Sequence, residues 1–251
     1  MGRLMRSPVD LWVYLSTSPL IWLTLTVCTW IAAVELSVRL KRNPLVNPVM
    51  ISIIVLSAVM SVFDIPYEKF FAGAQFVHFL LGPATVAIAV PLYLQWAEVK
   101  KVLAPIGVAL AVGSVVAVLS VIALGWLINA RPTEDDLPRD VLISFLPKSA
   151  TAGVAMAISA SLGGNPSLTA VLVILTGITG ALIVTPMMNR MGIRDYAARG
   201  FAVGLTSHGI GTARAYDVDP TAGLFAGIAM ALNAIATSII VPLAARLLLG
   251  S

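Results

Sequence analysis

The sequence predicts an all-α polytopic membrane protein with seven to nine membrane segments, built as an inverted-topology repeat with broken or re-entrant helices. Of its 251 residues, 59% are hydrophobic and only 11% are charged, whereas charged residues make up about 25% of an ordinary soluble domain. The mean hydropathy is +0.95. So few charges cannot cover a water-soluble fold of this size, which excludes a soluble enzyme. The single cysteine, Cys28, excludes a disulfide framework and a cysteine-based metal cluster.

Long uncharged runs give the expected order of the membrane segments. A bilayer core of ~30 Å needs about 20 apolar residues for each crossing helix. Five runs have that length, another is nearly two spans long, and one is too short to cross; in chain order the seven are 11–34, 43–63, 70–97, 102–130, 149–189, 200–213 and 220–245. The net charge of +4 comes from cations that flank these runs, so we interpret them as determinants of orientation. We expect one membrane domain over residues 1–251, with the N-terminal run retained as its first span.

A weak internal repeat relates the two halves of the chain. Asn47-Pro48 and Asn165-Pro166 each open an apolar run, and proline is tolerated in the first turn of a helix. Further along, the segments 82–85 and 209–212 share the pattern G-x-x-T. Both pairs are separated by about half the chain. The pattern predicts repeat 1 over about 7–130 and repeat 2 over about 141–250.

The charges beside the repeated segments indicate that the two halves have opposite orientations. Cations at 39–42 precede the first Asn-Pro run, and the acidic loop 134–140 precedes the second. Lys100 and Lys101 follow the first G-x-x-T segment, whereas Asp217 and Asp219 follow the second. Because cations concentrate on the cytoplasmic side, we expect Asp217 and Asp219 on the opposite side from the arginines at 190–199.

The charges of the flanking loops agree with this inverted arrangement only if residues 141–163 begin and end on the outer side of the membrane. We therefore expect a re-entrant or broken element there, interrupted around Pro147-Lys148 or Ala152-Gly153. Non-helical backbone at membrane depth is tolerated where it is buried in protein or lines a watery cavity. Inverted repeats with such interruptions are the architecture of secondary transporters, whose half-helix N-termini bind anions near the midplane.

Three interrupted segments carry the candidate site. Lys148 stands in an otherwise uncharged stretch from 141 to 189, where a lysine costs about 3 kcal/mol at mid-membrane. We interpret Lys148 as a ligand for an anionic substrate. The alternative is a lysine that snorkels to the outer headgroups. In the segment 206–214, Arg214 can bind a carboxylate through two hydrogen bonds and His208 can carry a proton near pH 7. The alternative there is a glycine-rich packing turn.

The third segment, 75–85, holds His78 and the helix-breaking Gly82-Pro83, with a simple proline kink as the alternative. The predicted substrate-binding residues are Lys148, Ser149, Thr151, Ser207, His208, Gly209, Thr212, Arg214, Thr85, Gly82 and His78. We predict no catalytic residue, no cofactor and no metal ligand set. Asn233 is expected only to hydrogen-bond across helices.

At these segments the chain resembles the LrgB/CidB family, and through it the C-terminal part of plastidal glycolate/glycerate translocators. The resemblance covers about residues 20–249. It rests on Asn47-Pro-Val-Met-Ile-Ser-Ile53, the string from Phe71 to Tyr93, Pro147-Lys-Ser-Ala-Thr151, Leu175-Thr-Gly-Ile-Thr-Gly180 and Ser207-His-Gly-Ile-Gly-Thr-Ala-Arg214. Ala152-Gly153 departs from the threonine-proline of the family pattern, which bears on the local shape of that interruption.

The resemblance implies two functions. Some bacterial members are described as holin/antiholin-like effectors of murein hydrolases and lysis, encoded beside a small LrgA/CidA-type membrane partner. Others are linked to movement of small carboxylates such as pyruvate, glycolate and glycerate. A carboxylate carrier needs a lysine and an arginine at two helix interruptions, whereas a holin has no use for them.

We therefore expect a multi-pass transporter of small monocarboxylates in the bacterial cytoplasmic (inner) membrane. Its expected partners are the substrate, membrane lipid, an LrgA/CidA-type protein and further copies of itself, with no nucleic acid. The alternative is a regulatory or pore-forming lysis effector without a substrate of its own.

Overall fold

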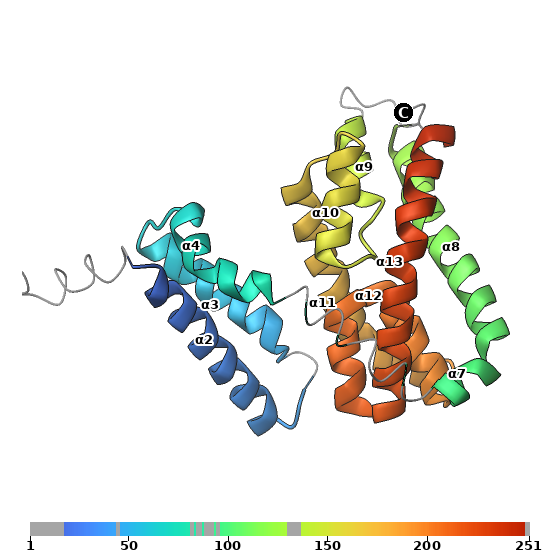
Figure 1. Ribbon diagram of the computed structural model, residues 1–251, viewed down its shortest axis with the longest axis horizontal. Coiled ribbons are helices and arrows are strands. Elements are labelled where there is room, and N and C mark those ends of the chain that lie inside the picture. The colour runs from blue at the N-terminus through green and yellow to red at the C-terminus, as the bar shows by residue number, and fades with distance from the viewer. Residues whose placement is uncertain are drawn as a thin grey trace, which may run out of the picture. The chain divides into compact units, whose positions relative to one another are not determined.

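The computed structural model describes residues 18–43, 46–80, 83, 87, 93, 96–129 and 137–248 (Figure 1). All regular secondary structure among these residues is helical, which confirms the predicted all-α class. The chain divides into two compact units, Met1–Ala87 and Ile88–Ser251. Each is described by itself. Two predicted site residues, Gly82 and Thr85, lie outside the described residues.

The first unit contains α2 (Pro19–Arg39), α3 (Pro48–Val62) and α4 (Tyr67–Phe79), with α2 packed against both others. Trp22 of α2 is fully buried, and its ring meets the Phe70 ring of α4 edge-on at a centroid distance of 6.2 Å. Helix α3 has 15 residues, which is short for a bilayer core of ~30 Å. The structure therefore does not show the single-span helix expected over 43–63.

The two Asn-Pro pairs start helices in the same way. Asn47 caps α3 by accepting from the backbone N–H of Val49 at 2.9 Å, with Pro48 in the first turn. Asn165 caps α11 (Pro166–Arg190) by accepting from the N–H of Ser167 at 3.0 Å, with Pro166 in the first turn. Each side chain satisfies an N–H that has no partner within its helix. This confirms the expected helix starts, while the inverted relation of the halves stays a prediction.

The second unit holds the candidate site. Its helices, besides α11, are α7 (Trp96–Lys101), α8 (Leu103–Asn129), α9 (Arg139–Phe145), α10 (Ala152–Ser161), α12 (Tyr196–Val218) and α13 (Pro220–Leu248). Together with α2 of the first unit, α8, α11 and α13 are long and apolar enough to cross a membrane. Large apolar side chains such as Leu175 and Ile235 are 54% and 62% exposed, as expected of helices that face lipid rather than water.

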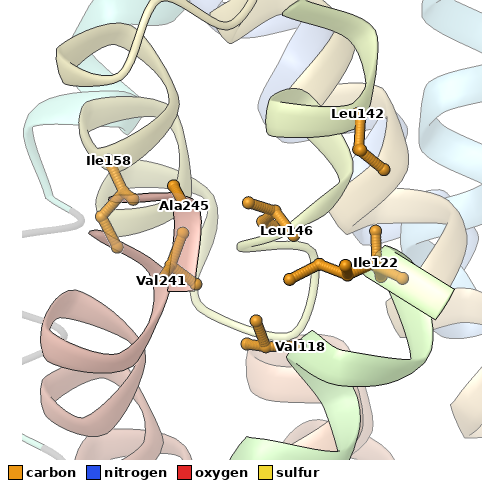
Figure 2. Close-up of a cluster of buried hydrophobic side chains, with 8 residues drawn as sticks. Val118, Ile122, Leu142, Leu146, Ile158, Val241 and Ala245 are labelled. Atoms are coloured by element: carbon orange, nitrogen blue, oxygen red, sulfur yellow. The ribbon is translucent and has the colours of Figure 1, made fainter. Parts of the chain in front are cut away.

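Two apolar clusters set the directions of the long helices. At one end of the unit, Ile106 of α8 packs with Phe201 of α12 and Leu224 of α13. At the other end, shown in Figure 2, residues of α8, α9, α10 and α13 meet: Val118, Val121, Ile122, Leu142, Leu146, Ile158, Val241 and Ala245. Because α8 and α13 both begin at the first cluster and end at the second, they run parallel.

Helices α9 and α10 form a helical hairpin, hereafter the first hairpin, whose tip is residues 146–151. After α10 the chain returns to the end of α9, where the N–H of Asn165 donates to the Ser144 hydroxyl at 2.8 Å. Gly164 lies so close to Ile143 that an added Cβ would come within 2.9 Å of its Cγ2. The interruption predicted at Pro147-Lys148 is therefore confirmed, whereas Ala152-Gly153 begins α10.

Helix α12 is broken at His208, whose φ of 42° and ψ of −134° are not helical. A Cβ at Gly211 would lie 3.0 Å from the Val203 carbonyl oxygen, although residues eight apart in an unbroken helix are separated by ~12 Å. Val203 and Ala215 also share one buried cluster. Residues 196–207 and 209–218 therefore fold back on each other as the second hairpin, with residues 205–209 as its tip.

This reversal corrects the expected position of Asp217 and Asp219. Arg199 and Gly200 near the start of α12 line the same small cavity as Arg214 and Val218 near its end, so both ends of α12 lie together. Asp219 therefore lies at the same end of the unit as Arg199, not at the opposite one. Flanking charges predict on which side of the membrane the end of a segment lies only if that segment crosses the membrane. Helix α12 does not cross, because the backbone at His208, with its positive φ, reverses the direction of the chain.

The two hairpins enter the unit from opposite ends. Val184, near the end of α11, packs against the cluster that holds Ala222 and Ala226 from the start of α13, while Ile158 of α10 shares a cluster with Val241 near the end of α13. Helices α11 and α13 are therefore antiparallel. Each hairpin is followed by a long helix, and the second such pair runs opposite to the first.

Candidate functional site

The tips of the two hairpins meet at an open cavity of about 370 Å³ against α11. The first tip contributes Lys148, the second contributes Thr206 and Ser207, and α11 contributes Thr176 and Thr179. Apolar side chains and one glycine complete the wall: Phe145, Leu172, Leu175 and Gly180. One lysine and four hydroxyl-bearing side chains thus line one space in an otherwise apolar protein, which suits a small anion with further hydrogen-bonding groups.

The cavity lies about halfway along helices of membrane-spanning length. The Lys148 Nζ donates a long hydrogen bond of 3.4 Å to the carbonyl oxygen of Ala117, which is at the middle of the 27-residue helix α8. Thr176 and Thr179 are likewise at the middle of the 25-residue helix α11. A lysine that snorkels to the headgroups would lie toward a helix end, so this depth favours the ligand interpretation of Lys148.

Lys148 is half-buried, and no acidic side chain within the described ranges forms an ion pair with it. A buried ammonium group without a counter-charge is unfavourable because it loses hydration without a compensating partner. An anion in the cavity would supply that missing charge. The arrangement therefore favours a negatively charged ligand over a neutral one.

Two glycines of α11 allow the second tip to approach it. A Cβ at Gly180 would overlap the Ser207 hydroxyl, and a Cβ at Gly177 would lie 2.6 Å from the His208 Cε1. The sequence places Thr176-Gly177 and Thr179-Gly180 three residues apart, so both threonines share a face of the helix. In the sequence, the segment 175–180 served only to show the family resemblance, and Thr176 and Thr179 were not predicted as site residues. Paired Thr-Gly steps in an apolar helix were the available signal.

His208 and Thr212 stabilise the break rather than line the cavity. The imidazole Nε2 of His208 donates to the Val173 carbonyl oxygen at 2.8 Å, and the side chain is 5% exposed. The Thr212 hydroxyl donates to the His208 carbonyl oxygen at 2.7 Å. These bonds hold the strained residue in place against α11. The proposed proton-carrying role of His208 stays a prediction.

The other predicted residues have different surroundings. Ser149 is buried at the first tip, Thr151 is the N-cap residue of α10, and Gly209 follows the break in α12. None of these three lines the cavity. Arg214 lies at a separate cavity of about 20 Å³, so the structure does not bring it together with Lys148. His78, in the first unit, is exposed and meets the Phe71 ring edge-on at 5.9 Å.

Asn233 of α13 joins both tips through its buried side-chain amide. Its Nδ2 donates to the carbonyl oxygens of Ser149 and Leu205, each at 3.0 Å. Its Oδ1 accepts from the Ser114 hydroxyl of α8 at 2.8 Å. The expected bonding across helices is confirmed, but nothing in the sequence indicated that both partners would be hairpin tips. Among the described residues, no cluster of histidine, cysteine or acidic side chains is arranged to hold a metal.

These features define a helical membrane protein with an open cavity, midway along its long helices, whose largely apolar wall holds one lysine and four hydroxyl-bearing side chains. The model of the LrgB-like family matches residues 26–247. The chain therefore belongs to the LrgB-like family, as the resemblance predicted.

Several relatives match over most of their own length. The uncharacterized protein YxaC of Bacillus subtilis (strain 168) is 35% identical over 224 residues, which are 89% of this chain and 94% of that protein. The holin-like protein CidB of Staphylococcus epidermidis (strain ATCC 12228 / FDA PCI 1200) is 30% identical over 201 residues, or 80% and 85% of the two chains. The holin-like protein CidB of Staphylococcus aureus (strain N315) is 27% identical, over 89% and 94% of the two chains. No solved structure matches the chain.

Proposed function

We propose that this protein is a membrane transporter of small monocarboxylates of the pyruvate, glycolate and glycerate class, with its binding site in the Lys148 cavity. The observation that carries the proposal is the Lys148 amine beside four hydroxyls, midway along helices of spanning length. The amine would pair with the carboxylate, and the hydroxyls of Thr176, Thr179 and Ser207 would bond to the remaining oxygens of the substrate.

The size of the cavity and the arrangement of the hairpins support a carrier. About 370 Å³ is at the small end of ligand pockets, which span roughly 300–1,000 Å³, and it suits a two- or three-carbon acid with a few waters. Secondary transporters place their sites where interrupted segments of inverted repeats meet near the midplane. In our proposal the inverted pair is 139–190 and 196–248, each a re-entrant hairpin followed by a span, which redraws the boundaries expected from the sequence.

A holin-like effector of murein hydrolase activity and lysis is the second candidate function. The holin-like names of the staphylococcal relatives favour it over a transporter. A pore-forming effector, however, gives no role to a half-buried lysine at a hairpin tip. We also propose location in the bacterial inner membrane, assembly with further copies and with a small LrgA/CidA-type protein, and no enzymatic activity.

Uptake by proteoliposomes distinguishes the two functions. Radiolabelled pyruvate, glycolate and glycerate are offered to vesicles that hold the purified protein, with and without the small partner. We expect saturable uptake that is lost in Lys148→Met, which removes the charge at similar length, and partly retained in Lys148→Arg. A trapped fluorescent dye reports pores in the same vesicles. Uptake no greater than in empty vesicles would contradict the carrier, and dye release by both parent and Lys148→Met would favour the lysis effector.

A further inference from the structure

The role of Asn233 follows from hydrogen bonds to residues that are distant in the sequence, which only the tertiary structure shows. It lies at the middle of the 29-residue helix α13 and is 1% exposed. Its amide has two N–H donors and one carbonyl acceptor with two lone pairs. All of this capacity is used, because two backbone carbonyls accept from Nδ2 and the hydroxyls of Ser114 and Thr237 donate to Oδ1 at 2.8 and 3.4 Å.

The two carbonyl groups come from the two hairpin tips. Ser149 directly follows Lys148 in the first tip, where the chain is not helical. Leu205 lies three residues before the break in α12, and in an unbroken helix its carbonyl would accept from the N–H of Gly209, just beyond that break. A buried carbonyl without a donor is costly at this depth. The Asn233 side chain therefore stabilises the helix interruptions at both hairpin tips, although the two hairpins enter the unit from opposite ends.

We infer that Asn233 is a positioning residue that clamps the two hairpin tips together, so that the Lys148 amine and the Ser207 hydroxyl face one cavity. The clamp acts through backbone groups that neighbour the binding residues, since Ser149 follows Lys148 and Leu205 precedes Ser207 by two residues. Asn233 itself does not line the cavity. The consequence for substrate binding rests on the proposed function, whereas the clamp itself does not.

Hydrogen–deuterium exchange of the full chain in nanodiscs tests the clamp without a ligand. Asn233→Leu removes both donors at similar volume, and Asn233→Asp removes them while keeping an acceptor for Ser114, which covers the case that the leucine variant folds poorly. We expect exchange about tenfold faster in peptides over 146–152 and over 205–210, with the start of α11 unchanged. Ser114→Ala is the matched control, because it removes a partner of Oδ1 but keeps both bonds to the tips.

Unchanged exchange, faster exchange at only one tip, or equal acceleration over the whole chain would each overturn the inference. Pyruvate binding then tests the functional consequence in a double-mutant cycle with Lys148→Met. If Asn233 acts by placing Lys148, the Kd rises about tenfold in Asn233→Asp but no further when Lys148→Met is already present. Independent, additive losses would overturn the positioning role. If the parent binds no carboxylate, the proposed function fails while the exchange result still decides the clamp.

Discussion

Single residues at the cavity carry the polar chemistry of this protein. Lys148 supplies the charge, and Ser207, a residue that is 1% exposed, contributes its hydroxyl-bearing side chain to the cavity wall. The Ser207 hydroxyl lies 3.2 Å from the Thr206 hydroxyl, which itself donates to the Ala202 carbonyl oxygen at 2.9 Å, so Ser207 is the member of this pair that can donate to an anion. Because these groups lie in apolar surroundings, each bond to a ligand is stronger than in water.

The Ser207 hydroxyl is expected to contribute to ligand binding. Ser207→Ala should weaken pyruvate binding about fivefold to tenfold, because a hydrogen bond is worth about 1 kcal/mol. Ser238→Ala is the matched control, since Ser238 is exposed on α13 and its hydroxyl donates to the Ala234 carbonyl of its own helix. Equilibrium binding of radiolabelled pyruvate to the purified protein measures both. Equal affinities in the two variants would contradict the site.

His208 combines a strained backbone with a stabilising side chain. Its φ of 42° is uncommon for a residue with a Cβ, and its imidazole is anchored to Val173. His208→Ala loses the anchor and keeps the strain, whereas His208→Gly loses the anchor and relieves the strain. We expect the glycine variant to be more stable than the alanine variant by about 1 kcal/mol, measured by thermal unfolding in detergent. Equal stability would show that the break is not strained.

At the scale of elements, the glycines of α11 decide how closely the second hairpin approaches. Gly180→Ala places a methyl group where the Ser207 hydroxyl now lies, so the tip must move away from α11. We expect destabilisation by about 1–3 kcal/mol from overpacking, together with loss of carboxylate binding. Gly107→Ala in α8 is the control, because an added Cβ there meets nothing within 4 Å. Normal binding by Gly180→Ala would show that the approach of the tip is unimportant.

The cap at the start of α11 is a second element-scale feature. Asn165 accepts from the N–H groups of Ser167 and Leu168 at 3.0 and 3.1 Å. Asn165→Ala should lower the free energy of unfolding by about 1 kcal/mol, whereas Asn165→Asp should retain most of it because aspartate caps equally well. Chemical denaturation in micelles compares the two. A loss of the same size in Asn165→Asp would mean that the amide donors, not the capping oxygen, matter.

At the scale of the whole molecule, the second hairpin changes the membrane topology that charges alone predict. If α12 folds back, Met191 and Val218 lie on one side of the membrane and Ser167 lies on the other. In a Cys28→Ser background, single cysteines at 191 and 218 should react with an impermeant maleimide only after the cells are permeabilised. A cysteine at 167 should react in intact cells. Labelling of 218 together with 167 would instead support a crossing α12.

Much of the fold class and the location of the interruptions could be predicted from the sequence. The low charge content and the length of the apolar runs predicted a helical membrane protein, and the membrane-spanning length of α8, α11 and α13 confirms this prediction. Proline beside a lone lysine marked the first tip, and a short run with closely spaced glycines marked the second. These signals are local, because a helix break depends on the backbone preferences of a few neighbouring residues.

The contacts between residues that are distant in the sequence could not be predicted in the same way. Thr176 and Thr179 join the cavity, Asn233 reaches both tips, and Arg214 lies at a different cavity. In a soluble helix, the alternation of polar and apolar residues shows which face is buried. In this chain, faces turned to lipid and faces turned to protein are both apolar, so the sequence lacks that contrast.

The sequence by itself therefore determined the class of protein, its family and the places of the two helix breaks at the hairpin tips. Only the tertiary structure decided that α12 reverses and that the two tips meet against α11. The physical reason is that His208 adopts its left-handed backbone conformation through long-range contacts, namely the carbonyl of Val173 and the space left by Gly177 and Gly180. None of these contacts is with a neighbour in the chain, so no local pattern encodes them.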